Sequence, residues 1–118
     1  MIPAKTYRVT REDLVAYANA SGDPNPIHQD EEVARSVGLP NVIAHGMFTM
    51  ALAARFVDEY VGRPGQIQEL SAKFTKPVVV PIEGTEVTVE GEDVDGKIRL
   101  TVTCQGERVL GNPVAILR

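Results

Sequence analysis

The chain has 118 residues, of which 43% are apolar and 24% are charged, and this composition is typical of one globular domain. Its formal net charge of −4 and scattered basic residues argue against a nucleic-acid surface and against a polybasic membrane contact. We find no signal-peptide pattern and no apolar run long enough to cross a bilayer, and the one cysteine, Cys104, cannot form an intrachain disulfide. These features favour an intracellular, cytoplasmic protein, and the alternating pattern around Cys104 indicates a packed strand residue rather than a nucleophile.

The first predicted helix follows a capping box, the sequence Thr10-Arg11-Glu12-Asp13. This helix is expected to run to about Ala20, because Ser21-Gly22 then interrupts the pattern. A second, short helix is predicted after Asp30, and Gly38 would close it.

A longer helix is predicted from Gly46 to Val61. Its residues are apolar nearly all round, so we expect it to be buried on all sides rather than amphipathic. Gly62 and Pro64 should end it.

The second half of the chain has the pattern of strands. Strands are predicted at about 66–76, 86–90, 97–105 and 107–117, and Asp95-Gly96 is a strong hairpin turn. One buried helix followed by long antiparallel strands predicts an α+β domain in which the sheet wraps around the helix. A single helix covers only part of a sheet face, so pairing with a second subunit is also expected.

Residues 21–28, Ser-Gly-Asp-Pro-Asn-Pro-Ile-His, concentrate the polar chemistry of the chain. Asp23 and His28 supply a carboxylate and an imidazole, Asn25 adds a donor and an acceptor, and two prolines stiffen the loop between them. Such a loop is suited to hold and activate water. The competing interpretation is structural: Asp and Asn before proline form Asx turns, and the histidine only packs.

His45 and Gly46 lie where the long helix is expected to start. The free N–H groups of a first helical turn, together with the positive end of the helix dipole, can bind a carbonyl oxygen that gains negative charge. Glycine would let that oxygen approach the backbone closely. The alternative is a plain helix entry, with Gly46 allowing a tight turn and His45 capping or packing.

Two other site types were weighed. Asp23, His28 and His45 form a two-histidine, one-carboxylate set that could hold iron, but the usual compact His-x-Asp/Glu pairing is absent. A triad of Ser21, His28 and Asp23 is disfavoured because Ser21 lacks the Gly-x-Ser-x-Gly elbow. With no glycine-rich nucleotide loop either, we expect no metal and no cofactor.

Residues 17–34 closely resemble the hydratase-2 signature of the MaoC-like (R)-specific enoyl-thioester hydratases and dehydratases. The segments 43–47 and 73–78 are also similar to that family, and 111–115 more weakly. The resemblance covers essentially the whole chain, so it implies a single hotdog domain over residues 1–118. The hotdog is an antiparallel β-sheet wrapped around one long central helix.

The resemblance also implies roles for individual residues. Asp23 and His28 match the catalytic dyad, which holds a water as general base and acid, and Gly46 matches the residue whose backbone N–H polarises the thioester carbonyl. Ser21, Asn25 and His45 would support the loop or the substrate. Water would add to the β-carbon of a trans-2-enoyl thioester to give the (R)-3-hydroxyacyl product, or the reverse dehydration would occur.

The implied partners are an acyl-CoA or acyl-carrier-protein thioester and a second hotdog, in a homodimer, a larger homo-oligomer or a heterodimer. Two departures from the family pattern stand out. Ala54 occupies a position where some members place a serine that orients the catalytic loop, so that support must come from elsewhere. The chain also begins close to its first helix, which would trim or loosen an edge strand.

The sequence is also compatible with two alternatives to a hydratase. A hotdog thioesterase needs the same grip on the thioester but releases a free thiol. A non-catalytic partner subunit of a heterodimeric dehydratase is the other alternative, although such a subunit would not need Asp23, Asn25 and His28.

Overall fold

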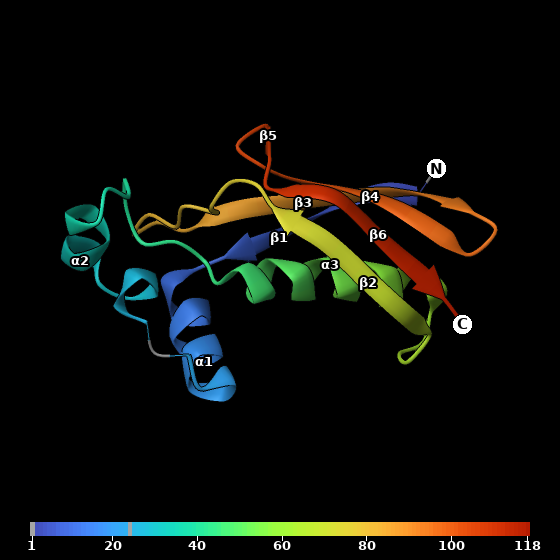
Figure 1. Cartoon of the computed structure of the whole chain (residues 1–118), viewed down its shortest axis with the longest axis horizontal. Coiled ribbons are helices and arrows are strands. Elements are labelled where there is room, and N and C mark those ends of the chain that lie inside the picture. The colour runs from blue at the N-terminus through green and yellow to red at the C-terminus, as the bar shows by residue number, and fades with distance from the viewer. Residues whose placement is uncertain (1, 24) are drawn as a thin grey trace.

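One antiparallel sheet spans the computed structural model, which describes residues 2–23 and 25–118 (Figure 1). Across the sheet, the strands follow the order β1 (Ile2–Val9), β3 (Thr85–Val94), β4 (Lys97–Cys104), β6 (Leu110–Leu117) and β2 (Ile67–Phe74). A two-residue strand, β5 (Glu107–Arg108), pairs with β4 beside this path. The predicted Asp95-Gly96 turn joins β3 to β4, and both residues have the positive φ angles, 52° and 82°, that a type I′ hairpin requires.

Helix α3 (Gly46–Val61) packs along one face of this sheet (Figure 1). Its inward side chains Phe56 and Val57 are almost completely buried. They share a core with inward residues of the strands, among them Val87, Val89, Ile98, Val102 and Ala115. The α+β prediction and the hotdog fold, a sheet wrapped around one long helix, are confirmed.

The remaining helices gather at the end of the molecule where α3 begins (Figure 1). They are α1 (Arg11–Ser21), the 3-10 helix η1 (Pro26–His28) and α2 (Glu31–Ser36). The predicted capping box of α1 is present: the Thr10 hydroxyl accepts from the Asp13 N–H at 3.3 Å, and the Asp13 carboxylate accepts from the Thr10 N–H at 2.9 Å. Gly22 ends α1 in the left-handed region and turns the chain into the loop that carries Asp23.

Three expectations about the elements are wrong. Helix α3 is not buried all round, because the sheet covers only one side of it; Met47, Ala51 and Arg55 are exposed on the other. The last strand is split into β5 and β6, since the chain bends at Val109, whose N–H donates to Val102. The N-terminal edge strand is not trimmed: β1 has eight residues and six of them pair with β3, with a register shift between Ile2 and Lys5. No helix in the described part of the chain is long and apolar enough to cross a bilayer.

Candidate active site

Two side chains of the loop accept hydrogen bonds from its own backbone. The Asp23 carboxylate accepts from the Asn25 N–H at 3.3 Å, and the Asn25 side chain accepts from the Ile27 N–H at 3.2 Å. These are the Asx turns of the structural interpretation, and they start η1. The short helix then turns His28 inward, where only 7% of it is exposed, while Asp23 stays exposed. The structural and catalytic interpretations of this loop are therefore compatible.

One ring nitrogen of His28 is engaged by the backbone. Its Nδ1 lies 2.6 Å from the carbonyl oxygen of Ile43. A carbonyl oxygen only accepts, so Nδ1 carries the hydrogen, and in the neutral ring Nε2 holds the lone pair. Burial lowers the pKa of His28 below its ordinary value, and the neighbouring His45 lowers it further, whereas the Ile43 hydrogen bond and Asp23 oppose this shift. The environment thus favours a neutral imidazole that can accept a proton at Nε2.

His45 packs directly against His28. The two rings are stacked with centroids 3.7 Å apart and an angle of 24° between their planes, and Tyr17 meets His45 edge-on at 4.7 Å. The Nε2 of His45 lies 3.2 Å from the backbone oxygen of Asp23 and donates to it. Its Nδ1 is buried and has no hydrogen-bond partner among the described residues. His45 therefore joins the start of α3 to the loop of Asp23.

Gly46 begins α3. No side chain in the described chain caps this helix end, so the N–H groups of Gly46 and Met47 are available for a ligand, whereas the Phe48 N–H donates to the His45 oxygen at 3.0 Å. The glycine is not needed for a left-handed backbone, since its φ lies outside that region. Its missing side chain leaves room for a neighbour: a Cβ atom at Gly46 would lie 2.9 Å from the ring of Phe74.

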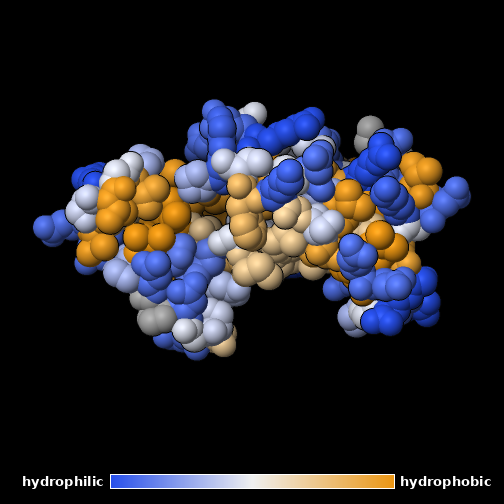
Figure 2. All heavy atoms as spheres, in the orientation of Figure 1, coloured by the Kyte–Doolittle hydropathy of each residue, from blue (hydrophilic) through white to orange (hydrophobic). Residues whose placement is uncertain are grey.

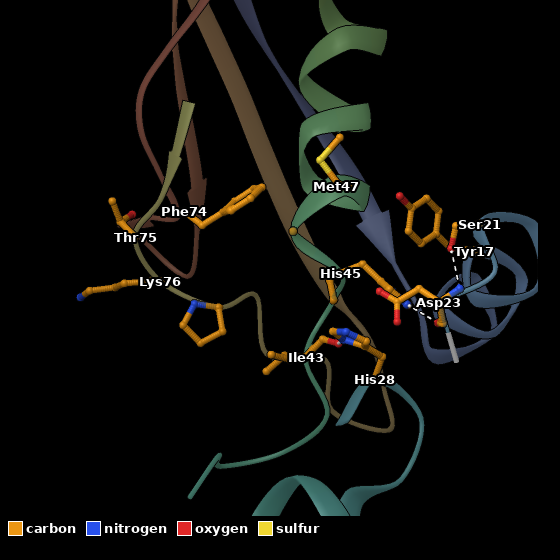
Figure 3. Close-up of a pocket in the computed structure, with 13 residues that line it drawn as sticks. Tyr17, Ser21, Asp23, His28, Ile43, His45, Met47, Phe74, Thr75 and Lys76 are labelled. Atoms are coloured by element: carbon orange, nitrogen blue, oxygen red, sulfur yellow. Dashed lines mark hydrogen bonds between the residues drawn. The ribbon is translucent and has the colours of Figure 1, made fainter. Parts of the chain in front are cut away.

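A pocket of about 600 Å³ brings these groups together (Figure 3). This volume is within the range of small-molecule sites. Figure 3 shows Tyr17, Ser21 and Asp23 on one side of the start of α3, and Phe74, Thr75 and Lys76 on the other. The lining is completed by His28, Ile43, Ala44, His45, Gly46, Met47 and Pro77.

Most of the residues singled out in the sequence lie in this pocket. Asp23, His28 and His45 each place one ligand-type atom within 4.8 Å of the others, and Gly46 lines the same cavity. Ser21 is at its edge, and its hydroxyl accepts from the Asp23 N–H at 3.4 Å. The side chain of Asn25 instead starts η1, and Asn25 is not among the lining residues.

Ala54 lines a different hollow, together with Arg55 and Glu59. His45, rather than residue 54, contacts the loop of Asp23, through the backbone oxygen of Asp23 at 3.2 Å.

Sequence reasoning assigned no role to Tyr17 or Phe74, although both line the pocket. Tyr17 lies within the motif of residues 17–34, and Phe74 lies within the segment 73–78 that shares the family resemblance. Their positions in these motifs were the only available signal. A helical tyrosine and a strand phenylalanine otherwise have the pattern of ordinary packing residues.

The two histidines are poorly arranged for a shared metal ion. An imidazole binds a metal in the plane of its ring, at about 2.1 Å from the nitrogen. The planes of His28 and His45 are stacked at 3.7 Å and inclined by only 24°, so they converge far beyond that bond length. The cluster of Asp23, His28 and His45 is thus better suited to a water molecule than to iron.

Comparisons with known proteins agree with this fold. The family described as MaoC like domain matches residues 2–109. A 3-hydroxyacyl-thioester dehydratase X of Mycobacterium tuberculosis is 38% identical over 95 residues, which are 76% of this chain and 31% of that protein. The chain therefore spans about a third of the length of that relative.

Two solved structures are similar along the whole chain. A MaoC-like dehydratase has a TM-score of 0.90 and 35% identity, covering 99% of this chain and 38% of its own. The (R)-hydratase from A. caviae has a TM-score of 0.85 and 25% identity, covering 100% of this chain and 93% of its own. With its sheet, its central helix and its match over residues 2–109, the chain belongs to the family of MaoC-like domains.

Proposed function

We propose that this chain catalyses (R)-specific hydration of trans-2-enoyl thioesters, or the reverse dehydration of (3R)-hydroxyacyl thioesters. The observation that carries the proposal is the shared pocket of Asp23, His28 and Gly46. It offers a carboxylate and a neutral imidazole for water beside an uncapped helix start for a carbonyl oxygen. The similar proteins named dehydratase and (R)-hydratase support the same reaction class.

The proposed mechanism uses each group as the structure presents it. A water molecule sits between the Asp23 carboxylate and His28 Nε2, and these two groups take up its proton as its oxygen attacks the β-carbon. The electrons of the C=C bond move toward the thioester carbonyl, whose oxygen accepts a hydrogen bond from the Gly46 N–H. The dyad then returns a proton to the α-carbon, so the net change is the addition of one water.

Hydration of crotonyl-CoA tests the proposal directly. The reaction is followed as the loss of enoyl absorbance, and chiral analysis should find the (R)-3-hydroxy product. Asp23→Asn and His28→Gln should each lower kcat by about a hundredfold or more, the scale of one general acid–base contribution. Asp95→Asn is the matched control, because Asp95 lies in the distant hairpin turn with a φ of 52° that asparagine tolerates. Near-normal turnover by either folded dyad variant would sink the assignment.

A thiol-reactive dye in the same assay tests the thioesterase alternative, because the dye detects the free thiol that a thioesterase releases. Rapid thiol release without water addition to the enoyl group would favour it. Absence of both reactions would favour the non-catalytic subunit instead.

We propose supporting roles for three further residues. His45 holds the backbone of Asp23 through Nε2, and Ser21 accepts from the Asp23 N–H. Asn25 keeps η1 in place through the Ile27 N–H, which is 3.2 Å from its side chain. All three act on the loop geometry, and none of them is assigned a proton-transfer step.

We also propose that residues 1–118 form one domain and that two copies pair through the edge strand β2. The exposed side of α3 provides an adjoining apolar surface, visible in the hollow of Figure 2. An antiparallel pair centred on Ser71 would place Glu69 of each copy opposite Lys73 of the other, and all three residues are exposed here. The charges of one β2 strand therefore complement those of the same strand in a second copy.

Sedimentation measures this pairing. Lys73→Glu would place like charges opposite each other and should weaken self-association, whereas the double variant Glu69→Lys, Lys73→Glu should restore it. A wild-type protein that sediments as a monomer would favour a heterodimer with another hotdog.

A further inference from the structure

Phe74 has an unusual position for a large aromatic residue. It ends the edge strand β2, and 59% of it is exposed. Its ring nevertheless reaches across to the start of α3, where Cε1 and Cζ would lie 2.9 Å and 3.0 Å from a Cβ atom at residue 46. Phe74 also lines the pocket, across the start of α3 from Asp23 (Figure 3).

The ring is held near Gly46 by its strand rather than by a tight core. Among the described residues of one chain, strand β2 pairs only with β6, and the register shifts between Ser71 and Lys73 just before Phe74. The following residue, Thr75, donates its backbone N–H to the oxygen of Val109 at 3.3 Å. The backbone of Phe74 is thus anchored by its pairing with Leu110.

We propose that Phe74 is a specificity-determining residue: its ring, seated against Gly46, closes the pocket at the thioester carbonyl and selects acyl groups without a branch at C2. This inference rests on the proposed function. If the carbonyl oxygen binds the Gly46 N–H, C1 lies at the helix start and C2 is one bond away. A methyl group on C2 then competes for the space that the ring fills.

The first test compares two substrates, crotonyl-CoA and its 2-methyl derivative in the same trans geometry. The measured quantity is the ratio of their kcat/KM values, and comparing this ratio between variants cancels the different intrinsic reactivities of the two substrates. Phe74→Ala should shift the ratio toward the branched substrate by about tenfold or more, the usual discrimination for one methyl group in a fitted pocket. An unchanged ratio would overturn the inference.

The second test uses Gly46 as the partner of Phe74. Gly46→Ala keeps the backbone N–H but pushes the ring aside, so it should also relax the ratio. Because the clashing atoms are the tip of a half-exposed ring, the variant should fold with little change in Tm. The double variant Gly46→Ala, Phe74→Ala should match Phe74→Ala alone, since both changes act through the same ring. A double variant whose ratio is the product of the two single effects would contradict this coupling.

Control measurements distinguish a failure of this inference from a failure of the proposed function. Ile82→Ala removes a large apolar side chain that is 78% exposed and does not line the pocket, and it should leave the ratio unchanged. If the kcat/KM ratio of Phe74→Ala changes only together with its sedimentation, Phe74 belongs to a subunit contact. That result would overturn the inference. If the wild-type chain hydrates neither substrate, the proposed function itself fails. Wild-type hydration with an unchanged Phe74→Ala ratio refutes the inference alone.

Discussion

Replacing His45 by phenylalanine should separate the position of the catalytic loop from the stability of the fold. His45 makes one hydrogen bond, from Nε2 to the backbone oxygen of Asp23 at 3.2 Å, and its other nitrogen is buried without a partner. Phenylalanine keeps an aromatic ring against His28 and Tyr17 but removes both nitrogens.

The energetic terms in His45→Phe nearly cancel. Leaving the Asp23 oxygen unpaired costs about 1–3 kcal/mol, and removing the unpaired Nδ1 recovers a similar amount. The stacked and edge-on aromatic contacts are retained, each about 0.5–1.5 kcal/mol. We therefore expect the free energy of unfolding to change by no more than about 1 kcal/mol. His45→Ala should cost about 2–4 kcal/mol, because it loses these contacts and leaves a cavity.

The activity should respond differently. Once its carbonyl is released, Asp23 samples positions away from His28, so His45→Phe should lower kcat about tenfold or more and leave KM nearly unchanged. His45→Gln is the rescue variant, since its side-chain N–H₂ can reach the place of the lost Nε2 donor. The assay combines urea unfolding with steady-state hydration of crotonyl-CoA. Wild-type kcat in His45→Phe, or a loss that His45→Gln shares fully, would refute the positioning role.

Two further predictions concern pH and the first helix. Burial lowers the pKa of His28, so the acidic limb of kcat/KM should lie below pH 6.5, the ordinary value. For the same reason, as pH falls below 6.5, the unfolded chain takes up a proton that the native ring resists, and the native state should lose stability. An acidic limb above pH 6.5 would contradict the neutral-ring assignment. Thr10→Ala removes one half of the capping box of α1 and should lower the unfolding free energy by about 1 kcal/mol in a denaturant titration. Thr10→Ser, which keeps the hydroxyl, should lose much less, and an equal loss in both variants would argue against the cap.

The elements that were predicted correctly carry local signals. Each of these signals lies within a few neighbouring residues. They are the capping box at Thr10, the cap at Asp30 and the type I′ turn at Asp95-Gly96. The bounds of α3 follow from the helix start at Gly46 and the left-handed Gly62 that ends it. Local backbone preferences decide such features, so they can be inferred without knowing the fold.

The wrong predictions concern features that depend on contacts between segments far apart in the sequence. Strand β1 has no strong alternation, and its pairing with β3 joins segments about 80 residues apart in the chain. The exposed side of α3 was also missed, because composition shows that Met47 and Ala51 are apolar but not which side the sheet covers. Long-range pairing and coverage are properties of the assembled sheet.

The site shows the same division between local and long-range information. The sequence contains Asp23 and His28 in one loop, but it does not show which nitrogen of His28 faces the pocket. That is set by the carbonyl of Ile43, which lies in another segment. Likewise, the space at Gly46 is limited by the ring of Phe74, a residue of β2.

The short stretch before α3 connects these distant parts. Ala44 donates to Val78 at 2.9 Å and Val80 donates to Val42 at 2.9 Å, so the stretch is bonded to the chain that follows β2. Between these two hydrogen bonds, the carbonyl oxygen of Ile43 accepts a hydrogen bond from Nδ1 of His28. The orientation of the imidazole is therefore fixed by backbone pairing rather than by a second acidic side chain. In this arrangement Asp23 need not orient the ring, which agrees with the proposal that the two groups share a water.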